Sequence, residues 1–486
     1  MEPFIHLHVH TQYSLLDGQA SIDALIDKAQ KDGMNAIAVT DHGNMFGIKE
    51  FFNKVSKKNG KPLGAIKDLE KEQKALKGKE ALSTEEQARL QEIPSLIEAE
   101  KKKIFKPIIG CECYCARNGR HNKTAKEDRS GYHLIILAKN LKGYKNLIKM
   151  VSISWTEGFY GRPRIDHELL EKYHEDLIVC SACLGGEIPQ HIMHDRIDKA
   201  EESILWFKKL FGEDYYLEMQ RHETHDPNAD CTTYPKQQEV NKVLIELARK
   251  HNVKLIATND VHFVNQEDAE AHDRLICLST GKDLDDPTRM RYSKQEWMKT
   301  TAEMNAIFAD IPEALSNTLE IADKVDFYSI DSGPIMPTFA IPEDFGTEES
   351  YREKFSEQDL FEEFTRDENG NVVLSEEDAK DKIKKLGGYD KLYRIKLEAD
   401  YLRKLTYDGA KVCYGDNLND EVRERLDFEL HIMKTMGFPG YFLIVQDFIA
   451  AAREELGVSV GPGRGSAAGS AVAYCLGITK IDPIKY

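Results

Sequence analysis

Three of the sixteen histidines stand within the first ten residues, at the alternate positions His6, His8 and His10. Alternate residues of a β-strand share a face, so the three imidazoles are expected to point the same way. Imidazoles this close would repel one another when protonated, and packing alone seldom requires them. The spacing therefore favours metal ligation by at least two of the three over a purely structural role.

Further polar residues stand at the ends of apolar stretches. TDHG (40–43) follows the apolar run 36–39, and NDVH (259–262) follows the run 255–258. Glu112 comes directly after the run 107–111, and His133 opens the run 134–138. Each residue alone is weak evidence for a site. Their repeated position, where an α/β sheet exposes its functional edge, predicts that they meet.

Imidazole together with carboxylate suits Zn²⁺, Mn²⁺ or Fe²⁺ better than Ca²⁺. Several such ligands would hold two or more ions about 3.5–4 Å apart. Ions at that spacing activate water and stabilise both the entering and the leaving oxygen of a phosphate ester. The residues themselves thus predict hydrolysis of a phosphate ester.

Cys111, Cys113 and Cys115 flank Glu112 and allow a competing interpretation. If Glu112 faces the metals, strand alternation turns all three thiols away from them. A zinc–thiolate site built from these thiols with Cys180 and Cys183 is the alternative, but the spacing lacks the paired C-x₂₋₄-C of a zinc ribbon.

Composition describes a chain of several globular domains. The 486 residues include 41% hydrophobic and 31% charged residues, 66 Lys+Arg against 83 Asp+Glu, and nine cysteines without regular spacing. The length suggests roughly two to four domains. A formal charge of −17 argues against a chain that coats nucleic acid through bulk charge. We expect no membrane span and no signal peptide, and a cytoplasmic protein with reduced thiols.

Strand-like and helix-like segments alternate from residue 4 to about 274. Strands are predicted over 5–9, 36–40, 107–113, 133–138, 177–180, 215–219 and 254–258, and helices include 21–31 and 236–251. This order predicts an α/β fold with a largely parallel sheet, which can close into a barrel. Two stretches rich in charge, 67–103 and about 343–419, are predicted to lie outside the core. Helices are also expected over 299–325, 421–436 and 442–455.

Eight collinear blocks resemble the polymerase-and-histidinol-phosphatase (PHP) domain and the start of the palm domain of bacterial C-family replicative DNA polymerases. They are HLHVHTQYSLLDG (6–18), AVTDHGNMFG (38–47), KPIIGCECYCA (106–116), HLIILAKN (133–140), CSACLGGEIPQ (180–190), IATNDVHF (256–263), MGFPGYFLIVQDFI (436–449) and VGPGRGSAAGSAVAYCLGITKIDP (460–483). The resemblance implies an α/β fold: a seven-stranded (β/α) PHP barrel, then part of an α+β polymerase-beta-like palm. It places the PHP domain at 1–275, with an insertion at 64–104, and the palm at 276–486, with an insertion at about 343–419.

The resemblance also implies a metal site and a nucleotide site. Metal ligands would be His8, His10, Asp17, His42, Glu112, His133, Cys183, Asp260 and His262, with Glu112, Asp260 and His262 as catalytic residues and His6 as a neighbour. They imply two or three divalent ions (Zn, Mn or Fe). The glycine-rich loop implies nucleotide-phosphate binding by Gly463, Arg464, Gly465, Ser466 and Ser470, with exposed amides at the start of the following helix.

The implied function is replication of DNA by a nucleotidyltransferase. Its implied partners are DNA, deoxynucleotides, a sliding clamp and a proofreading subunit. The acidic D-x-D segment that binds Mg²⁺ in the family's palm is missing after the glycine-rich loop, so we expect this chain not to extend DNA.

Two functions remain for the PHP part. The barrel either hydrolyses phosphoesters, as a 3′–5′ exonuclease or a pyrophosphatase, or binds metal chiefly to stabilise the polymerase and dock its partners. A free-standing histidinol-phosphate-type phosphatase leaves residues 421–486 without a role.

Overall fold

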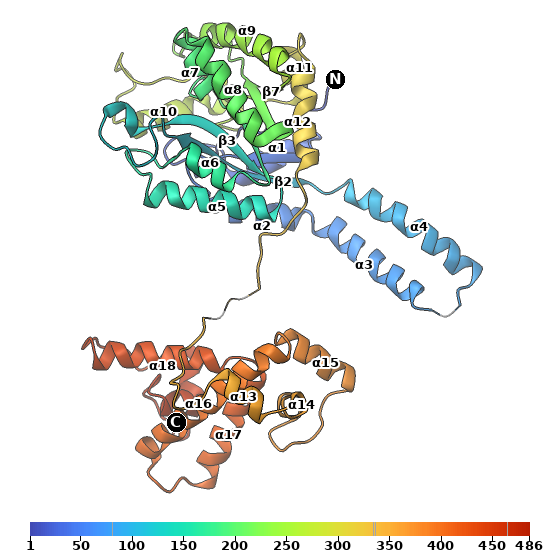
Figure 1. Cartoon of the computed structure of the whole chain (residues 1–486), viewed down its shortest axis with the longest axis vertical. Helices are drawn as coiled ribbons and strands as arrows, with labels where there is room; N and C mark the ends of the chain where they lie inside the picture. The colour runs from blue at the N-terminus through green and yellow to red at the C-terminus, as the bar shows by residue number, and fades with distance from the viewer. Residues whose placement is uncertain (80, 334, 336, 464) are drawn as a thin grey trace. The chain divides into compact units, whose positions relative to one another are not determined.

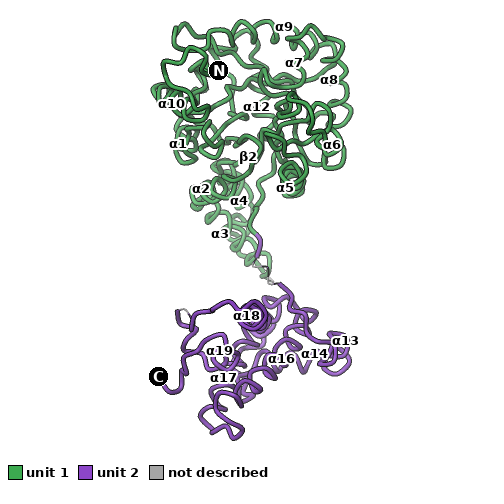
Figure 2. The backbone as a smooth tube through the Cα atoms, turned by 90° about the vertical axis from the view of Figure 1, so that its left-hand side faces the viewer, with its two compact units in different colours: residues 1–331 green, residues 332–486 purple. Residues whose placement is uncertain are grey.

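The computed structural model describes residues 1–486 except Glu80, Pro334, Met336 and Arg464. It divides the chain into two compact units, Met1–Asp331 and Ser332–Tyr486 (Figure 2). Among the described residues, no helix combines the length and the apolar character needed to cross a bilayer.

The first unit is built around a curled sheet. Within the described residues its seven strands are β1 (Ala36–Val39), β2 (Lys106–Cys115), β3 (Tyr132–Ala138), β4 (Arg164–Ile165), β5 (Leu177–Cys180), β6 (Tyr215–Met219) and β7 (Lys254–Ala257). The order is β1-β2-β3-β5-β6-β7, and the short β4 pairs with β2. Six of these strands agree with predicted strands to within two residues at each end, whereas β4 was not predicted.

Most of the sheet is parallel, but β3 runs antiparallel to both β2 and β5. No α-helix connects β2 to β3 in the described residues, which leaves only a 3₁₀ turn at Lys126–Arg129. Because a parallel neighbour needs a longer crossover, usually helical, the chain returns antiparallel here. His133 therefore opens its strand at the same edge where β2 approaches its end.

Residues 5–10 close the sheet into a barrel. The amide of Ala38 donates to the carbonyl of His6, and that of Thr40 donates to Val9. On the other side, Val9 bridges in parallel to Val261, just beyond β7. The predicted strand 5–9 thus fills a strand position between β1 and β7, although its pairing is too irregular to form a regular strand.

Helices surround this barrel (Figure 1). They are α1 (Ile22–Lys31), α2 (Ile48–Lys58), α5 (Leu141–Thr156), α6 (His167–Tyr173), α7 (Glu187–Met193), α8 (Ile197–Phe211), α9 (Thr233–His251), α10 (Ala269–Thr280), α11 (Thr301–Ile307) and α12 (Glu313–Lys324). Side-chain caps fix several helix starts: Ser21 accepts from the amide of Ala24, and Asn140 accepts from the amides of Lys142 and Gly143. Their buried faces and the strands share one apolar core.

The first charged stretch is a helical hairpin, α3 (Gly60–Lys77) and α4 (Thr84–Lys101), that extends away from the barrel (Figure 1). Its base is fixed by Asn59, whose side chain donates to the carbonyl of Phe105 at 2.7 Å and accepts from the Phe105 amide at 2.9 Å. These two hydrogen bonds join the two chain segments at the base of the hairpin, where it leaves the core.

The first compact unit extends past the domain boundary predicted at residue 275. α12 packs against β7, Asn317 donates to the carbonyl of Leu255, and Thr318 accepts from the amide of Ile5. Residues 299–325, expected to begin another domain, therefore pack with the barrel. The boundary at 275 stays a prediction about family domains, whereas the packed body ends at Asp331.

The described residues of the second unit form helices: α13 (Glu348–Lys354), α14 (Glu357–Thr365), α15 (Glu376–Lys385), α16 (Tyr389–Tyr414), α17 (Asp420–Thr435), α18 (Pro439–Glu454) and α19 (Ala471–Cys475). Among them one isolated bridge, Arg366–Val372, is the only extended pairing, so the β part expected of a palm is not seen here. Among the described residues, none of 343–419 belongs to the apolar core of the first unit, as predicted, but α16 helps to form the core of the second unit. Leu402 and Ala410 on α16 are buried with α17, α18 and α19.

Candidate metal centre

All nine residues predicted to bind metal lie together at one end of the barrel. Each comes from the closing segment 5–10, from a strand, or from a loop that follows a strand: His8, His10, Asp17, His42, Glu112, His133, Cys183, Asp260 and His262. We call them the nine-residue cluster. The backbone is strained at three of these loops, where Asp260 has φ 49°, Ala182, just before Cys183, has φ 62°, and Leu16, just before Asp17, has φ 59°. Left-handed conformations cost a non-glycine residue about 1–2 kcal/mol, so the surrounding fold must enforce them.

The first group of donors converges on one point. The Nε2 atoms of His8 and His10 lie 3.2 Å apart, and Asp260 Oδ1 lies 3.1 and 3.3 Å from them. The two oxygens of Glu112 are each 3.5 Å from one of these nitrogens. A tetrahedral zinc site with bonds of about 2.0–2.1 Å has ligand atoms about 3.3 Å apart. The observed separations match that edge.

A second group shares Glu112 with the first. His133 Nδ1 lies 2.8 Å from Glu112 Oε1, and Cys183 Sγ lies 3.5 Å from His133 Nδ1 and 4.0 Å from Glu112 Oε1. A longer Zn–S bond of about 2.3 Å makes the sulfur–nitrogen edge about 3.6 Å. Glu112 stands between the two groups, the position that a bridging carboxylate requires.

A third group surrounds His10, His42 and His262, whose nitrogens lie within 4.8 Å of one another. Asp17 Oδ2 is 3.0 Å from His42 Nε2, and Asp17 Oδ1 accepts from the Tyr292 hydroxyl at 2.8 Å. His42 Nδ1 reaches Glu112 Oε2 at 2.5 Å. Imidazoles packed this closely, with carboxylates beside them, form a third place for a cation.

The electrostatics of the cluster favour ionised carboxylates. Burial raises the pKa of Glu112, but His133 and His42 outweigh it and hold that pKa well below the usual value. His8 and His262 do the same for Asp260 against its burial. Burial, together with His42 and His262, lowers the pKa of His10 to about 3. Against their burial, the neighbouring carboxylates raise the pKa of His8, His42 and His133 well above 6.5. Metal binds ionised carboxylates and neutral imidazoles, so an ion bound here would displace protons from these three rings.

Four buried polar atoms of the cluster make close ionic contacts at most and no hydrogen bond of acceptable geometry within the described residues: His42 Nδ1, Glu112 Oε2, Asp260 Oδ1 and His262 Nε2. Buried polar atoms without partners are rare, because each costs about 1–3 kcal/mol. Here they face one another across the cluster. Orphaned atoms of these types fit divalent transition metals, which the cluster's His, Asp, Glu and Cys donors also suit.

Residues that the sequence analysis missed orient the cluster. Glu218 Oε1 accepts from His8 Nδ1 at 2.6 Å and from the Thr258 hydroxyl at 2.5 Å, which leaves His8 Nε2 facing the cluster. Ser14 lies 2.9 Å from His10 Nδ1 and donates to the buried Asp41. Carboxylates that orient a ligand histidine in this way are a common feature of metal sites. The one sequence signal for this role is that Glu218 is a charged residue within an otherwise apolar strand.

Other predicted features lie outside the cluster. His6 turns away, with its Nε2 2.7 Å from the carbonyl of Lys299. Cys111, Cys113 and Cys115 are buried in the apolar core on the opposite face of β2 from Glu112. No metal-ligating group among the described residues combines them with Cys180 and Cys183, so the alternative zinc–thiolate site is not formed.

A cavity of about 240 Å³ gives access to the cluster. Its lining includes His42, Glu112, His133, Cys183, Asp260 and His262 on one side and Gln220, His222, Met290, Arg291 and Tyr292 on the other. The Nε of Arg291 is buried and has no partner in the described part of the chain. A guanidinium opposite clustered metal ligands can bind a phosphate group by donating hydrogen bonds to its oxygens.

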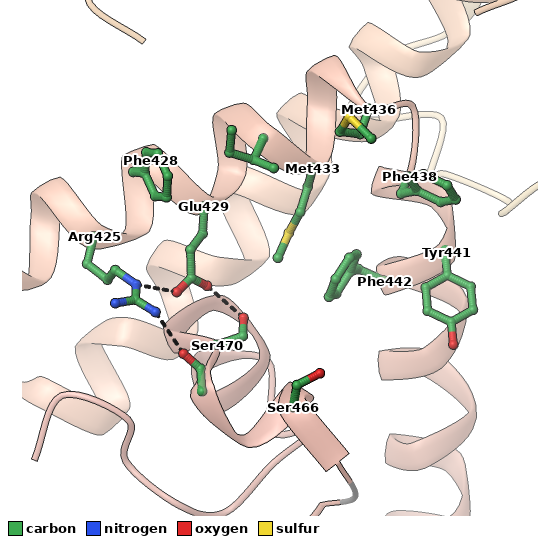
Figure 3. Close-up of a pocket in the computed structure, with 12 residues that line it drawn as sticks. Arg425, Phe428, Glu429, Met433, Met436, Phe438, Tyr441, Phe442, Ser466 and Ser470 are labelled. Atoms are coloured by element: carbon green, nitrogen blue, oxygen red, sulfur yellow. Dashed lines mark hydrogen bonds and ion pairs between the residues drawn. The ribbon is translucent and has the colours of Figure 1, made fainter. Parts of the chain in front are cut away.

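In the second unit, the glycine-rich loop predicted to bind nucleotide phosphate lies beside a mostly apolar pocket. Arg464 lies outside the described residues. Gly463 and Gly465 have positive φ. Ser466 and Ser470 line a pocket of about 720 Å³ between α17, α18 and the 3₁₀ turn Gly465–Gly469 (Figure 3). Most of that pocket is apolar, including Phe428, Ile432, Met433, Met436, Phe438, Tyr441 and Phe442.

The first amides of α19 are already engaged. Glu429 accepts hydrogen bonds from the amides of Ala471 and Val472 at 3.1 Å each and from the Ser470 hydroxyl at 2.6 Å. Arg425 donates to the same carboxylate at 2.5 Å (Figure 3). The first amides of α19 are therefore not free to bind an anion, because a side-chain carboxylate already occupies that place. Nucleotide-phosphate binding by Gly463, Gly465, Ser466 and Ser470 stays a prediction.

Comparison with known proteins gives two family matches. Residues 6–222 match the PHP domain, and residues 400–486 match the bacterial DNA polymerase III alpha NTPase domain. The chain is 41% identical over 488 residues to the DNA polymerase III subunit alpha of Borreliella burgdorferi, and 35% identical over 508 residues to that of Thermus aquaticus. Each alignment covers 99% of this chain but only 33% and 36% of the relative. The chain thus spans about a third of the length of these curated relatives.

Proposed function

Because the chain belongs to the family of bacterial DNA polymerase III alpha subunits, we propose that it acts in DNA replication and that its PHP barrel hydrolyses phosphoesters with bound divalent metals. The substrate class is a DNA 3′ end or pyrophosphate. The observation that carries the proposal is the nine-residue cluster, with its metal-like donor spacing and its orphaned buried atoms.

Two or three ions of Zn, Mn or Fe in the cluster would supply Lewis-acid activation of water and of the phosphate ester. His8, His10, Glu112 and Asp260 would hold the first ion, Glu112, His133 and Cys183 the second, and Asp17, His42 and His262 the third. Glu218 keeps the Nε2 of His8 turned toward the cluster through the hydrogen bond at Nδ1. Arg291 would bind the non-bridging phosphate oxygens from across the cavity.

The proposed acid–base work falls to groups that touch the cavity. Asp260 and His262 both line it, and His262 Nδ1 is fixed by the carbonyl of Asp260 at 2.7 Å. This hydrogen bond leaves His262 Nε2 without a partner among the described residues. It is therefore free to bind metal or to hold a proton near the reacting phosphate.

For the whole protein we propose the activity and partners of its relatives. These are template-directed nucleotide transfer with Mg²⁺, DNA and deoxynucleotide substrates, and contacts with a sliding clamp and a proofreading subunit. The names of the relatives and the match of residues 400–486 support the polymerase activity. The sliding clamp and the proofreading subunit rest on the family resemblance alone.

A structural role for the cluster is the second candidate. The deep burial of His8, His10 and Glu112, each at most 1% exposed, favours it, since closed sites are typical of structural metals. The cavity beside His42, Asp260 and His262 favours catalysis.

Hydrolysis of a single-stranded DNA oligonucleotide and of pyrophosphate, each with Mn²⁺ or Zn²⁺, separates the two roles. The double variant His10→Ala/Asp260→Ala should reduce turnover to background, while His174→Ala, outside the cluster, should retain it. Undiminished turnover in the double variant would place the chemistry elsewhere. A wild-type chain that binds metal and gains thermal stability but hydrolyses neither substrate would support the structural role and contradict the catalytic one.

A further inference from the structure

A second group of metal-ligating side chains lies on the other face of the sheet. The thiol of Cys115, the imidazole of His167 and the carboxylate of Glu187 each offer a ligand atom within 4.8 Å of the others. Cys115 is three residues from Glu112 on β2, and alternation places these two side chains on opposite faces. The group therefore stands between the sheet and its covering helices, apart from the nine-residue cluster.

The neighbours of this group orient two of its donors. Glu187 Oε1 accepts from the Ser203 hydroxyl at 2.5 Å, and Glu187 Oε2 lies 3.3 Å from His167 Nε2. The ring of His167 stacks on Trp206, with centroids 4.0 Å apart and planes 14° from parallel. The 3.3 Å separation is the edge of about 3.3 Å expected between two ligand atoms of a tetrahedral zinc ion.

Hydrogen bonds within the chain do not satisfy all the buried polar groups around this site. Cys115 is 1% and Glu187 8% exposed. His191, one helical turn after Glu187 on α7, has a buried Nδ1 without a partner among the described residues, and so has the hydroxyl of Tyr215. Burial and the nearby Glu187 carboxylate both raise the pKa of Tyr215. Unpaired buried polar atoms are uncommon, and these two lie in the part of the core that contains Glu187.

We propose that Cys115, His167 and Glu187 bind a zinc ion at a site separate from the nine-residue cluster. Thiolate, imidazole and carboxylate are the three ligand types that zinc takes in proteins, and thiolate argues against Mg²⁺ or Ca²⁺. Binding releases the thiol proton to solvent and joins the thiolate to the ion without any redox change. His167, whose side chain is 42% exposed, gives the ion its path from solvent.

The ion would join three elements of the first unit: the end of β2, the start of α6 and the start of α7. α7 begins directly after the loop that carries Cys183, and Gly186 in that loop bridges to His133. An ion at this place would fix the loop from behind, and its three protein ligands would leave a fourth position open to solvent. This inference stands whether or not the nine-residue cluster is catalytic.

Zinc content per chain is the first test, measured by elemental analysis after zinc saturation and dialysis. His167→Gln and Cys115→Ser should each lower the content by one equivalent relative to wild type. The matched controls are His174→Gln, at the other end of α6, and Cys113→Ser, two residues earlier on the same face of β2. Unchanged zinc in both site variants would overturn the proposal, as would an equal loss in the controls.

Cobalt substitution supplies a second readout in a Cys183→Ser background, which removes the thiol of the nine-residue cluster. Thiolate-to-cobalt absorption should persist in that background and disappear when Cys115→Ser is added. Its absence in the background variant would contradict the site. If Cys115→Ser fails to fold, His167→Gln decides alone, because this half-exposed side chain can be replaced without opening the core.

Discussion

Replacing Glu218 with glutamine tests how the barrel orients its first metal ligand. Glu218 Oε1 accepts three hydrogen bonds, from His8 Nδ1 at 2.6 Å, Thr258 Oγ1 at 2.5 Å and Gln220 Nε2 at 3.1 Å. Glu218→Gln keeps the shape of the side chain but removes the charge that holds the His8 N–H and the basicity that it gives to Nε2.

The expected magnitude follows from that loss. Removing a carboxylate that orients a ligand histidine typically weakens metal binding about 10–100-fold. At 1.36 kcal/mol per tenfold, this is about 1.4–2.7 kcal/mol of metal-binding free energy. The buried position of Glu218, 2% exposed, places the effect toward the upper end, since water cannot replace the lost charge.

Competition with a chromophoric chelator measures the affinity of the most tightly bound Zn²⁺ in wild type and variant. Glu398→Gln is the control, because Glu398 is a buried carboxylate (8% exposed) in the second unit that accepts from Arg394. Equal zinc affinity in wild type and Glu218→Gln would refute the orienting role. A loss of equal size in Glu398→Gln would show that the effect is not local.

Three further predictions concern other parts of the chain. Burial lowers the pKa of His6 from 6.5 to about 4, so its contribution to stability is present above pH 6.5 and is lost as the pH falls toward 4. The difference in unfolding free energy between wild type and His6→Gln, measured by denaturant titration, should therefore shrink by about 3 kcal/mol over that range. A difference that does not depend on pH would contradict the assignment. Replacing residues 61–103 with a short glycine–serine linker should leave zinc content and melting temperature unchanged, because Asn59 already joins the hairpin base to Phe105; a loss of either would mean that the hairpin supports the barrel. Glu429→Ala should destabilise the second unit by about 2 kcal/mol in chemical unfolding, because it leaves two amides and Arg425 without their acceptor; no change would show that water replaces the carboxylate.

Much of the barrel could be predicted from local patterns. The short stretches 36–39 and 254–257 became strands within a residue of the prediction, because each is rich in branched-chain residues and is followed by a polar residue. The antiparallel direction of β3 could not be predicted from the apolar runs, since it depends on the absence of a helix between β2 and β3. The irregular pairing of residues 5–10 depends likewise on neighbours from both ends of the barrel.

The candidate site was predictable where residue type alone limits the chemistry. Histidines at alternate positions and carboxylates at strand ends suit metal binding better than core packing, and the structure brings all nine residues together. Glu218 and Asp41 were missed because a single buried carboxylate carries no spacing signal. The engaged amides at the start of α19 were missed because their partner, Glu429, lies about 40 residues away in sequence and is recognised only from the packing of α17 against α19.

Anomalous diffraction at the zinc and manganese edges, from crystals grown with these ions, tests the central claim most directly. The account predicts at least two strong peaks within bonding distance of the cluster donors, one beside His8, His10 and Asp260 and one beside His133 and Cys183, with Glu112 between them. Crystals in which these side chains are paired by hydrogen bonds alone, with no anomalous peak among them at either edge, would contradict it.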